Sequence, residues 1–415
     1  MKIAIISYHT CPLATLGGKD TGGMNVYVRD LTRYLGHIGI HADVFTRSQD
    51  EHVPHILHDL GHGNRVVHIP AGPETPRPKE ELKDYVDEFV NGILAFSKEK
   101  GITYDLVFSH YWLSGLAALR LKLEWDVPVV HMFHTLALLK NEIARSEEEK
   151  DGEIRIEGER EVLSGIDKVI VATRDERKKL INLYSAKKKR IEIIPSGVDT
   201  TRFYPIPQDE AKEFVGVPHN EKMILFVGRI EPLKGIDNLI HAIAQMKGAD
   251  VLSECPHYLY IIGGDPNGDE GNMSSEMAHL QELRDQLGLS DLVIFLGKKD
   301  QDSLPYYYSA AEMVIMPSHY ESFGMVALEA MACGTPVIAT QVGGLQHLVQ
   351  DQETGFTVPH GDPDALEEKI TMLICKDGLR DVLSANSLSY TKKFRWEKIV
   401  RRLHKCFKTI IADYH

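Results

Sequence analysis

The segment Lys2-Ile-Ala-Ile-Ile-Ser-Tyr8 is apolar on both faces of an extended backbone. Such a run is typical of a buried parallel strand, because helices cover both faces of a parallel sheet. Comparable runs follow at residues 42–46, 104–108, 127–132, 168–173 and 191–195. Helical patterns separate most of them, as at residues 25–36 and 80–99. This alternation predicts an open α/β sheet whose strands are joined by crossover helices.

The same pattern restarts after a proline-rich stretch at residues 194–207. Further strands are predicted at 223–229, 258–264, 292–297, 313–317 and 336–340, and helices at 235–246, 274–287, 323–333 and 363–375. We therefore predict two Rossmann-like domains, at residues 1–204 and 205–390, with helical spacing continuing through 391–415. The last helix is expected to pack back across the domain junction. Two facing domains would form a deep cleft at the carboxyl ends of their strands, where ligands of such sheets bind.

The composition of the 415-residue chain excludes several classes of protein. With 43% hydrophobic and 26% charged residues it is neither disordered nor fibrous. Its 47 basic and 60 acidic residues give a net charge of −13, which argues against a nucleic-acid partner. The five cysteines lie far apart and form no C-x-x-C pair, so we expect reduced thiols. Without a signal peptide or a long apolar span, a cytoplasmic protein without a membrane partner is predicted.

The densest chemical signal lies between His319 and Ala339, where Glu321 and Glu329 are eight residues apart. A helix beginning at about Ser322 or Phe323 would offer free amides to a phosphate. Glu321 could then bind a sugar hydroxyl, and Glu329 could bind a ribose diol. An ordinary surface helix with two glutamates would show the same spacing, so this segment alone does not decide the function.

Two further segments carry weaker signals. Arg229 follows a predicted strand and Lys234 precedes a predicted helix, so both could meet a diphosphate and neutralise the charge of a leaving group. Two solvated loop cations would give the same pattern. Gly22 and Gly23 lie between the first strand and the first helix, where glycine lets the backbone approach a phosphate closely.

In combination, these three segments resemble the retaining GT-B glycosyltransferases of the sucrose-phosphate-synthase-like family over nearly the whole chain. The Glu-x7-Glu and G-R-x4-K-G spacings and the pair Phe394 and Trp396 carry the resemblance. Within the family, the segments at 22–28, 109–115 and 134–137, with Lys140 and Asn141, are most similar to the branch that glycosylates D-inositol 3-phosphate in mycothiol synthesis. Sucrose-phosphate synthases carry a glutamine where this chain has Met24.

The resemblance implies roles on the donor side. Gly23 would contact the donor diphosphate, which Arg229 and Lys234 would clamp, while Lys298 would border the base. The remaining donor contacts would come from one segment: Glu321, Phe323, Gly324, Met325 and Glu329. The residues implied to act in catalysis are His134, beside the reacting sugar, together with Arg229, Lys234 and Glu321.

The resemblance also implies an acceptor site in the first domain. Four residues match a phosphate-binding set: Lys79, Tyr111, Thr135 and Arg155. Asn25 would face the acceptor hydroxyls, and Lys140 matches a further phosphate contact of the sucrose-phosphate branch. From the sequence pattern alone, Lys79 and Arg155 could equally be solvated surface charges.

The mechanism implied is transfer with retention, in which the leaving diphosphate accepts the proton of the attacking hydroxyl. No D-x-D motif is evident in the first domain, and Arg229 with Lys234 can replace a divalent ion, so we expect no metal and no cofactor beyond the sugar nucleotide. Four histidines at residues 52–62 suit no common zinc site and are interpreted as loop or hairpin residues. The cations at 174–179 and 187–190 are interpreted as a solvated surface rather than a membrane-binding face.

The preferred interpretation is an enzyme that moves a hexosyl group from a UDP-sugar to inositol phosphate. Three alternatives stay open: sucrose-phosphate-like transfer to fructose 6-phosphate, a non-hydrolysing sugar-nucleotide epimerase, and a catalytically silent sugar-nucleotide binder. The base of the donor also stays open, as does a homodimer.

Overall fold

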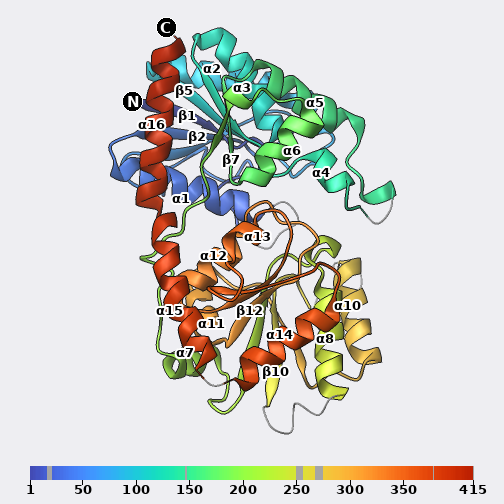
Figure 1. Cartoon of the computed structure of the whole chain (residues 1–415). Helices are drawn as coiled ribbons and strands as arrows, with labels where there is room; N and C mark the ends of the chain where they lie inside the picture. The colour runs from blue at the N-terminus through green and yellow to red at the C-terminus, as the bar shows by residue number, and fades with distance from the viewer. Residues whose placement is uncertain (16–20, 145–146, 249–255, 267–273, 377, 415) are drawn as a thin grey trace. The chain divides into compact units, whose positions relative to one another are not determined.

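The computed structural model describes the chain except residues 16–20, 145–146, 249–255, 267–273, 377 and 415 (Figure 1). The chain folds into two compact units. Unit 1 contains Met1–Ala14, Gly23–Gly197 and Trp396–His415, and unit 2 contains Thr15–Gly22 and Val198–Arg395. Both units are α/β structures built on a largely parallel sheet, which confirms the predicted fold class.

Eight strands of the described chain form the sheet of unit 1, in the order β3-β4-β2-β1-β5-β6-β7-β8. Their bounds are β1 Lys2–Ile6, β2 His41–Arg47, β3 Ile56–Leu57, β4 Arg65–Ile69, β5 Leu106–His110, β6 Val129–Met132, β7 Lys168–Val171 and β8 Ile191–Ile193. All pairs are parallel except β3 with β4. The histidine-rich segment thus contributes the short antiparallel strand β3.

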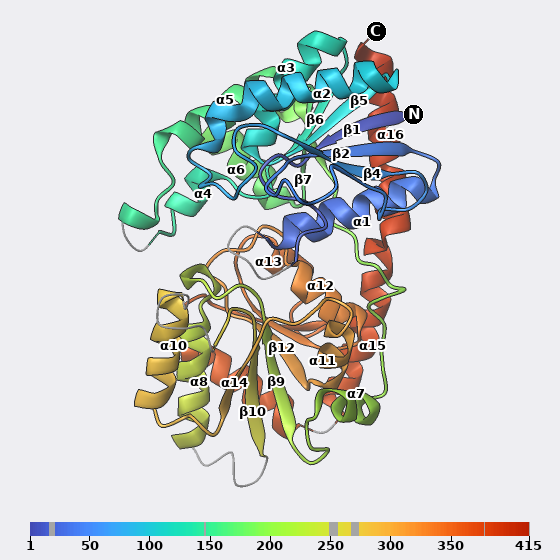
Figure 2. The same ribbon diagram turned by 180° about the vertical axis from the view of Figure 1, so that it is seen from behind.

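Helices cover both faces of this sheet. Their bounds are α1 Gly23–His37, α2 Val86–Lys100, α3 Trp112–Trp125, α4 Ala137–Asn141, α5 Glu153–Gly165, α6 Arg174–Tyr184 and α16 Trp396–Tyr414, with short 3-10 turns η1 Leu82–Tyr85, η2 Glu147–Glu149 and η3 Lys188–Arg190. Helices α2, α3 and α5 pack side by side on one face, and α1 packs against α16 (Figures 1 and 2).

Helix α16 brings the end of the sequence into the core of unit 1. Its apolar residues recur every three or four positions, and Trp396, Leu403 and Phe407 are fully buried. The Trp396 ring contacts Tyr27 edge-on with centroids 5.3 Å apart, and Phe407 contacts Phe108 on β5 at 5.4 Å. The last helix therefore completes a core that the first hundred residues begin.

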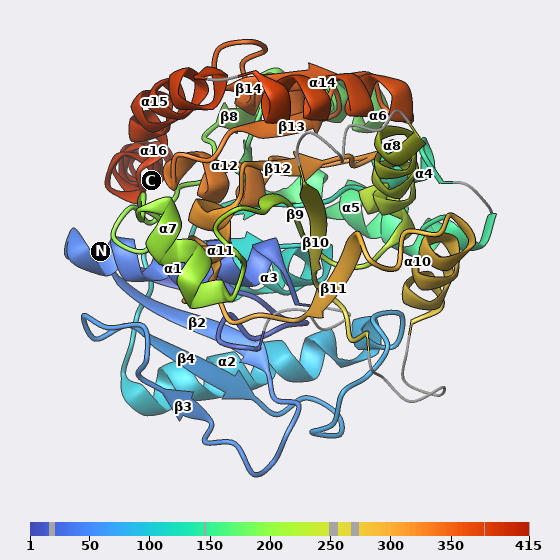
Figure 3. The ribbon, with the colours of Figure 1, turned by 90° about the horizontal axis from the view of Figure 1, so that it is seen from below.

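Unit 2 has a parallel sheet with the order β11-β10-β9-β12-β13-β14. Its strands are β9 Lys222–Val227, β10 His257–Ile262, β11 Val293–Gly297, β12 Met313–Met316, β13 Val337–Thr340 and β14 Gly355–Val358. Its helices are α7 Gln208–Val215, α8 Ile236–Gly248, α10 Ser275–Gln286, α11 Leu304–Ala310, α12 Met325–Ala332, α13 Leu345–Leu348, α14 Pro363–Cys375 and α15 Leu379–Thr391, with 3-10 turns η4 Pro232–Lys234 and η5 Lys392–Phe394. Helices α8, α10 and α14 cover one face, and α7, α11, α12 and α15 cover the other (Figure 3).

One local prediction was wrong. Helix α12 begins at Met325, not at Ser322 or Phe323. Gly324 has φ +95°, a left-handed conformation that ends the preceding loop and cannot continue into a right-handed helix. A Cβ at Gly324 would also lie 2.6 Å from the Leu345 side chain. No helix among the described residues is long and apolar enough to cross a membrane.

Candidate active site

The residues predicted for the acceptor lie near the carboxyl ends of the strands in unit 1. Tyr111 directly follows β5, and His134 and Thr135 follow β6. The others come from neighbouring loops and helices: Asn25 from α1, Lys79 from the segment before η1, Lys140 from α4 and Arg155 from the first turn of α5. Since β5 and β6 are parallel neighbours, their carboxyl ends meet at the same edge of the sheet.

Arg155 is the centre of a group that we call the Arg155 cluster: Lys79, Tyr111, Thr135, Lys140, Asp151 and Arg155. The buried guanidinium donates to the main-chain and side-chain oxygens of Thr135, both at 3.0 Å. Its carbon lies 5.0 Å from the centre of the Tyr111 ring, and the Lys79 ammonium lies 5.8 Å from the same ring. The structure thus brings together the four residues predicted for the acceptor phosphate.

Glu159 contacts this cluster through a hydrogen bond with Arg155. Its carboxylate is fully buried and accepts a 2.9 Å hydrogen bond from Arg155 Nε. It also accepts from the Tyr184 hydroxyl and, at 3.1 Å, from the amide of Ala137 at the start of α4. Burial raises the pKa of Glu159, and Arg155 opposes that rise. Sequence reasoning missed Glu159, although it lies one helical turn after Arg155, where the two side chains are neighbours.

Asp151 pairs with two of the three cations of the cluster. Its Oδ1 accepts from Arg155 NH1 at 3.0 Å, and its Oδ2 lies 3.0 Å from the Lys140 ammonium. Asn141 holds the main chain of Asp151 through hydrogen bonds of 3.0 and 2.7 Å. A carboxylate therefore occupies a position between Lys140 and Arg155 where a phosphate could bind. Nothing in the sequence pattern indicated Asp151.

His134 lies in a cluster of aromatic side chains. Its φ of +62° is unusual for a residue with a side chain, and Tyr111 shares this feature with φ +75°. His134 Nε2 lies 3.0 Å from Nδ1 of the fully buried His110, and the Tyr27 ring contacts His134 edge-on at 5.2 Å. Burial lowers the pKa of His134 to about 3, so its imidazole is neutral near pH 7. The His9 ring contacts the Tyr111 ring in a tilted arrangement with ring centres 4.5 Å apart, and His9 was not predicted.

Gly22 and Gly23 lie at the start of α1, and Asn25 connects this helix to the segment that follows β1. Gly23 is the exposed first residue of α1. The side-chain amide of Asn25 donates to Thr10 Oγ1 and to the main-chain oxygen of Cys11, both at 2.7 Å. Gly22 belongs to unit 2, where a Cβ at this position would lie 3.7 Å from Arg229 Nε. A side chain there would therefore contact Arg229.

In unit 2, three residues predicted for the donor and Glu231, which was not predicted, form a second group, the Lys234 cluster: Arg229, Glu231, Lys234 and Glu321. Lys234 Nζ donates to Glu321 Oε2 at 2.6 Å. Arg229 NH1 lies 2.8 Å from Glu231 Oε1, and both of these side chains are about one third exposed, at 40% and 32%. A main-chain hydrogen bond of 2.9 Å from His319 to Leu233 holds the two loops together.

A second glycine pair fixes the loop that carries Glu321. The Gly344 amide donates to the Glu321 carbonyl at 2.8 Å, and a Cβ on Gly343 would lie 2.0 Å from the same oxygen. Gly343 has φ +44°. Only glycine fits this close approach, which sets the main chain just before the amides of Phe323, Gly324 and Met325. Sequence reasoning missed this pair, although a Gly-Gly pair separated by two residues from the end of β13 was an available signal.

Glu329 and Lys298, which were also predicted to bind the donor, lie outside the Lys234 cluster. Glu329 is buried in α12, one turn after Met325, and accepts a 2.9 Å hydrogen bond from the Tyr308 hydroxyl. Tyr308 comes from α11 and was not predicted, because no local spacing relates it to Glu329. Lys298 is exposed on the loop after β11.

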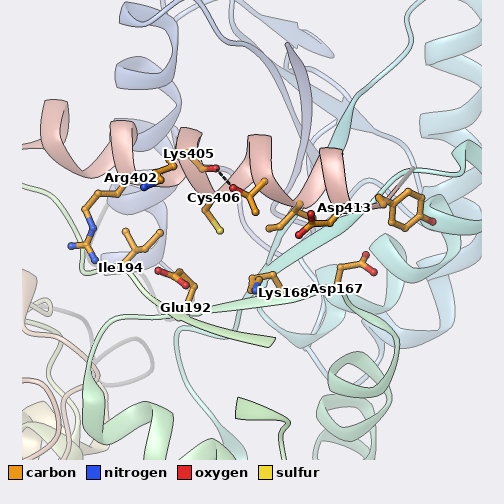
Figure 4. Close-up of a pocket in the computed structure, with 11 residues that line it drawn as sticks. Asp167, Lys168, Glu192, Ile194, Arg402, Lys405, Cys406 and Asp413 are labelled. Carbon is orange, nitrogen blue, oxygen red and sulfur yellow. Dashed lines mark hydrogen bonds between the residues drawn. The ribbon is translucent and has the colours of Figure 1, made fainter. Parts of the chain in front are cut away.

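A hollow of about 510 Å³ lies elsewhere in unit 1, between α16 and strands β7 and β8 (Figure 4). Its charged lining residues are three basic and three acidic: Lys168, Arg402, Lys405, Asp167, Glu192 and Asp413. None of the predicted site residues lines it. Among the described residues, no group of three histidine, cysteine or acidic side chains could hold a metal ion.

Comparison with known proteins agrees with this arrangement. Residues 21–202 match the model of Glycosyltransferase Family 4, and residues 207–389 match that of Glycosyl transferases group 1. The chain is 37% identical to the D-inositol 3-phosphate glycosyltransferase of Corynebacterium jeikeium over 418 residues, covering 100% of this chain and 98% of that protein.

Solved structures show the same fold. Sucrose-phosphate synthase from Thermosynechococcus elongatus superposes with a TM-score of 0.89 at 34% identity, covering 99% of both chains. Anabaena HepE, solved in complex with UDP and glucose, shares the fold with a TM-score of 0.75 at 20% identity, covering 99% of this chain and 100% of its own. The chain is a glycosyltransferase and belongs to the GT-B family that contains the D-inositol 3-phosphate glycosyltransferases.

Proposed function

We propose that this enzyme transfers a hexosyl group, with retention, from a nucleoside diphosphate sugar to an inositol phosphate. The observation that carries the proposal is the Arg155 cluster. At the carboxyl edge of a Rossmann-like sheet, the Arg155 guanidinium and the Lys79 ammonium lie 5.0 and 5.8 Å from the Tyr111 ring, and the guanidinium donates to the Thr135 hydroxyl. Charge-assisted hydrogen bonds from arginine suit a phosphate, since a guanidinium can hold two of its oxygens at once.

In this proposal, Lys79, Tyr111, Thr135 and Arg155 bind the phosphate of the acceptor. Asn25 faces the acceptor hydroxyls, and Lys140 adds a further contact to the phosphate. When the acceptor arrives, its phosphate competes with the Asp151 carboxylate for Lys140 and Arg155. The relatives named for D-inositol 3-phosphate support inositol phosphate as the acceptor.

Unit 2 would bind the donor. Arg229 and Lys234 clamp the diphosphate with help from Gly23, and Lys298 borders the base. The amides of Phe323, Gly324 and Met325 precede and begin α12, where the positive end of the helix dipole favours a phosphate. Glu321 holds the sugar, and Glu329, oriented by Tyr308, holds the ribose. We take a uridine diphosphate sugar as the first donor to test.

The proposed reaction needs no carboxylate nucleophile. The acceptor oxygen forms the new bond to the anomeric carbon as the bond to the diphosphate oxygen breaks on the same face. The proton of the acceptor hydroxyl passes to the departing diphosphate. Arg229 and Lys234 stabilise the charge that develops on the diphosphate, while the Arg155 cluster and His134 position the reactants.

We propose that the two cations take the place of a divalent metal ion. Activity should therefore persist in the presence of EDTA, measured as release of the nucleoside diphosphate. A complete loss of activity that magnesium or manganese restores would contradict this assignment.

The acceptor is tested by a double cycle with the wild type and Arg155→Lys. Each is assayed with inositol phosphate and with free inositol, using a panel of UDP-, GDP- and ADP-sugars. Arg155→Lys should raise KM for inositol phosphate about tenfold to a hundredfold, the worth of a charge-assisted hydrogen bond, and leave donor KM unchanged. Free inositol should be a poor substrate of the wild type and lose little more in the variant. An equal penalty with both acceptors would show that Arg155 does not meet the phosphate.

A second acceptor has a specific observation in its favour. The 34% identity to a sucrose-phosphate synthase extends over 99% of the chain. Fructose 6-phosphate also carries a phosphate that the Arg155 cluster could bind. Including it in the same panel distinguishes the two acceptors, and preferential turnover of fructose 6-phosphate would replace inositol phosphate in the proposal.

A further inference from the structure

Two histidines from neighbouring strands share one hydrogen bond next to the proposed reacting sugar. His110 is the last residue of β5, and His134 lies two residues after β6 ends. These strands are paired in parallel, with His110 opposite Met132, so both histidines lie at the same edge of the sheet. His110 Nδ1 and His134 Nε2 are 3.0 Å apart, a normal hydrogen-bond distance.

Only one proton lies between these two nitrogens. Burial lowers the pKa of both rings, to about 3 for His134 and well below the usual value for His110, so both are neutral near pH 7. A neutral imidazole has one N–H donor and one acceptor nitrogen. Either His110 donates from Nδ1 and His134 keeps its own proton on Nδ1, or His134 donates from Nε2 and His110 keeps its proton on Nε2.

The surroundings of His110 distinguish the two arrangements. His110 is fully buried, and its Nε2 has no hydrogen-bond partner among the residues that the structure describes. The first arrangement leaves a buried acceptor without a partner, whereas the second leaves a buried N–H without one. Orphaned buried N–H groups are rarer in proteins than acceptors that lack a partner. The first arrangement is therefore favoured.

We propose that His110 is a positioning residue that holds His134 in the tautomer with its proton on Nδ1. The inference rests on the proposed role of His134 beside the reacting sugar. In that tautomer, Nδ1–H is a hydrogen-bond donor for an oxygen of the sugar or of the leaving diphosphate, and no proton is transferred. Tyr27 holds the other side of the His134 ring, edge-on at an interplanar angle of 75°.

The tautomer can be measured without any substrate. Protein labelled with ¹⁵N-histidine gives long-range nitrogen–proton correlations that identify the protonated nitrogen of each ring, and His134→Asn assigns the His134 signals. We expect His134 to be protonated on Nδ1 in the wild type and to shift toward Nε2–H in His110→Leu. His110→Asn should retain the wild-type pattern, because the asparagine amide offers a donor near the position of Nδ1. A wild-type His134 protonated on Nε2 would overturn the inference.

The kinetic arm separates positioning from general damage to the fold. His110→Leu should lower kcat about tenfold or more, as expected when a preorganised donor is misdirected, with little change in acceptor KM. His110→Asn should restore most of the loss. His68→Leu is the matched control, since His68 is another buried histidine of the same sheet, on β4, and should retain kcat within about twofold. Equal impairment of the Leu and Asn variants of His110 would overturn the inference.

Failure of the proposed function can be distinguished from failure of this inference. If His134→Ala kept wild-type turnover, the role of His134 beside the sugar would be lost. The tautomer measurement would still decide whether His110 sets the protonation site of His134.

Discussion

The Arg155 cluster of unit 1 and the Lys234 cluster of unit 2 both pair cations with carboxylates, but they bury them differently. In the Arg155–Glu159 pair the side chains are 9% and 0% exposed, whereas in the Arg229–Glu231 pair they are 40% and 32% exposed. A buried ion pair is held in one geometry by the cost of leaving either charge alone, whereas an exposed pair exchanges easily with water and ions. The Arg155–Glu159 pair is thus expected to keep a fixed geometry, whereas Arg229 can exchange the Glu231 carboxylate for a diphosphate.

The largest effect is expected on removing the buried carboxylate. Glu159→Ala should reduce the free energy of unfolding of unit 1 by about 3–5 kcal/mol, because the buried Arg155 guanidinium loses its fully buried carboxylate partner and keeps only Asp151, which is 19% exposed. All three tryptophans, Trp112, Trp125 and Trp396, belong to unit 1, so urea unfolding followed by tryptophan fluorescence reports on this unit. Glu161→Ala, an exposed position on the same helix, is the matched control. A loss no greater than that of the control would remove the contrast between the clusters.

The second-largest effect is expected on removing a cation from the Lys234 cluster. Lys234→Ala should lower kcat/KM with every nucleotide donor about a hundredfold, equivalent to about 3 kcal/mol of transition-state stabilisation. The Lys234 ammonium donates to the Glu321 carboxylate, whose side chain is only 17% exposed. The free energy of unfolding of the variant is therefore also measured, to exclude misfolding as the cause. Wild-type turnover in this variant would contradict the assignment of the diphosphate to this cluster.

A pH effect of intermediate size should be confined to unit 1. Burial raises the pKa of Glu176 from 4.5 to about 7, although its carboxylate accepts a 2.8 Å hydrogen bond from the Ala172 amide. Because the folded state binds this proton more tightly, stability is greatest below pH 4.5 for this group and falls as the pH rises toward 7. Between pH 5 and 7.5, the wild type should lose about 2 kcal/mol more than Glu176→Gln. If the free energies of unfolding of the two proteins changed in parallel with pH, this prediction would be contradicted.

The smallest effect is expected at the exposed pair. Glu231→Ala should change the free energy of unfolding of unit 2 by less than about 1 kcal/mol, as for other exposed ion pairs. Circular dichroism follows both units, and the fluorescence transition of unit 1 serves as the internal control. A loss above about 2 kcal/mol would place the Arg229–Glu231 pair in the same class as Arg155–Glu159.

The sequence predicted most strands of both sheets, including β8 and β11 at two of the edges, but not β3, β4 or β14. The central strands are apolar on both faces, which makes them recognisable without any partner. Strand β4 carries Arg65 and His68, and β14 begins with Gly355, so neither shows a continuous apolar run. Both lie toward a sheet edge, where the environment imposes a weaker pattern.

The candidate site divides in the same way. Residues on loops after strands, such as Tyr111, Thr135 and Arg229, were predicted because their position follows from the strand pattern and from family resemblance. Tyr308 and His110 were given no role, since they act on Glu329 and His134, 21 and 24 positions away in sequence, which only the fold brings near. Asp151 precedes the first residue of α5, so no helical spacing relates it to Arg155. The exception is Glu159, whose spacing from Arg155 on one helix made the ion pair predictable.

Helix α16 also has a consequence for the order in which the protein can fold during synthesis. Unit 1 starts at the first strand, but its core lacks Trp396 and Phe407 until the ribosome has translated all of unit 2. Domains of nascent chains usually fold from the N-terminus onward, but here the last segment of unit 1 is synthesised after unit 2. Unit 2 can fold while Tyr27 and Phe108 still lack their ring contacts with Trp396 and Phe407. A nascent chain that stops before α16 therefore has an incomplete core in the proposed acceptor-binding unit.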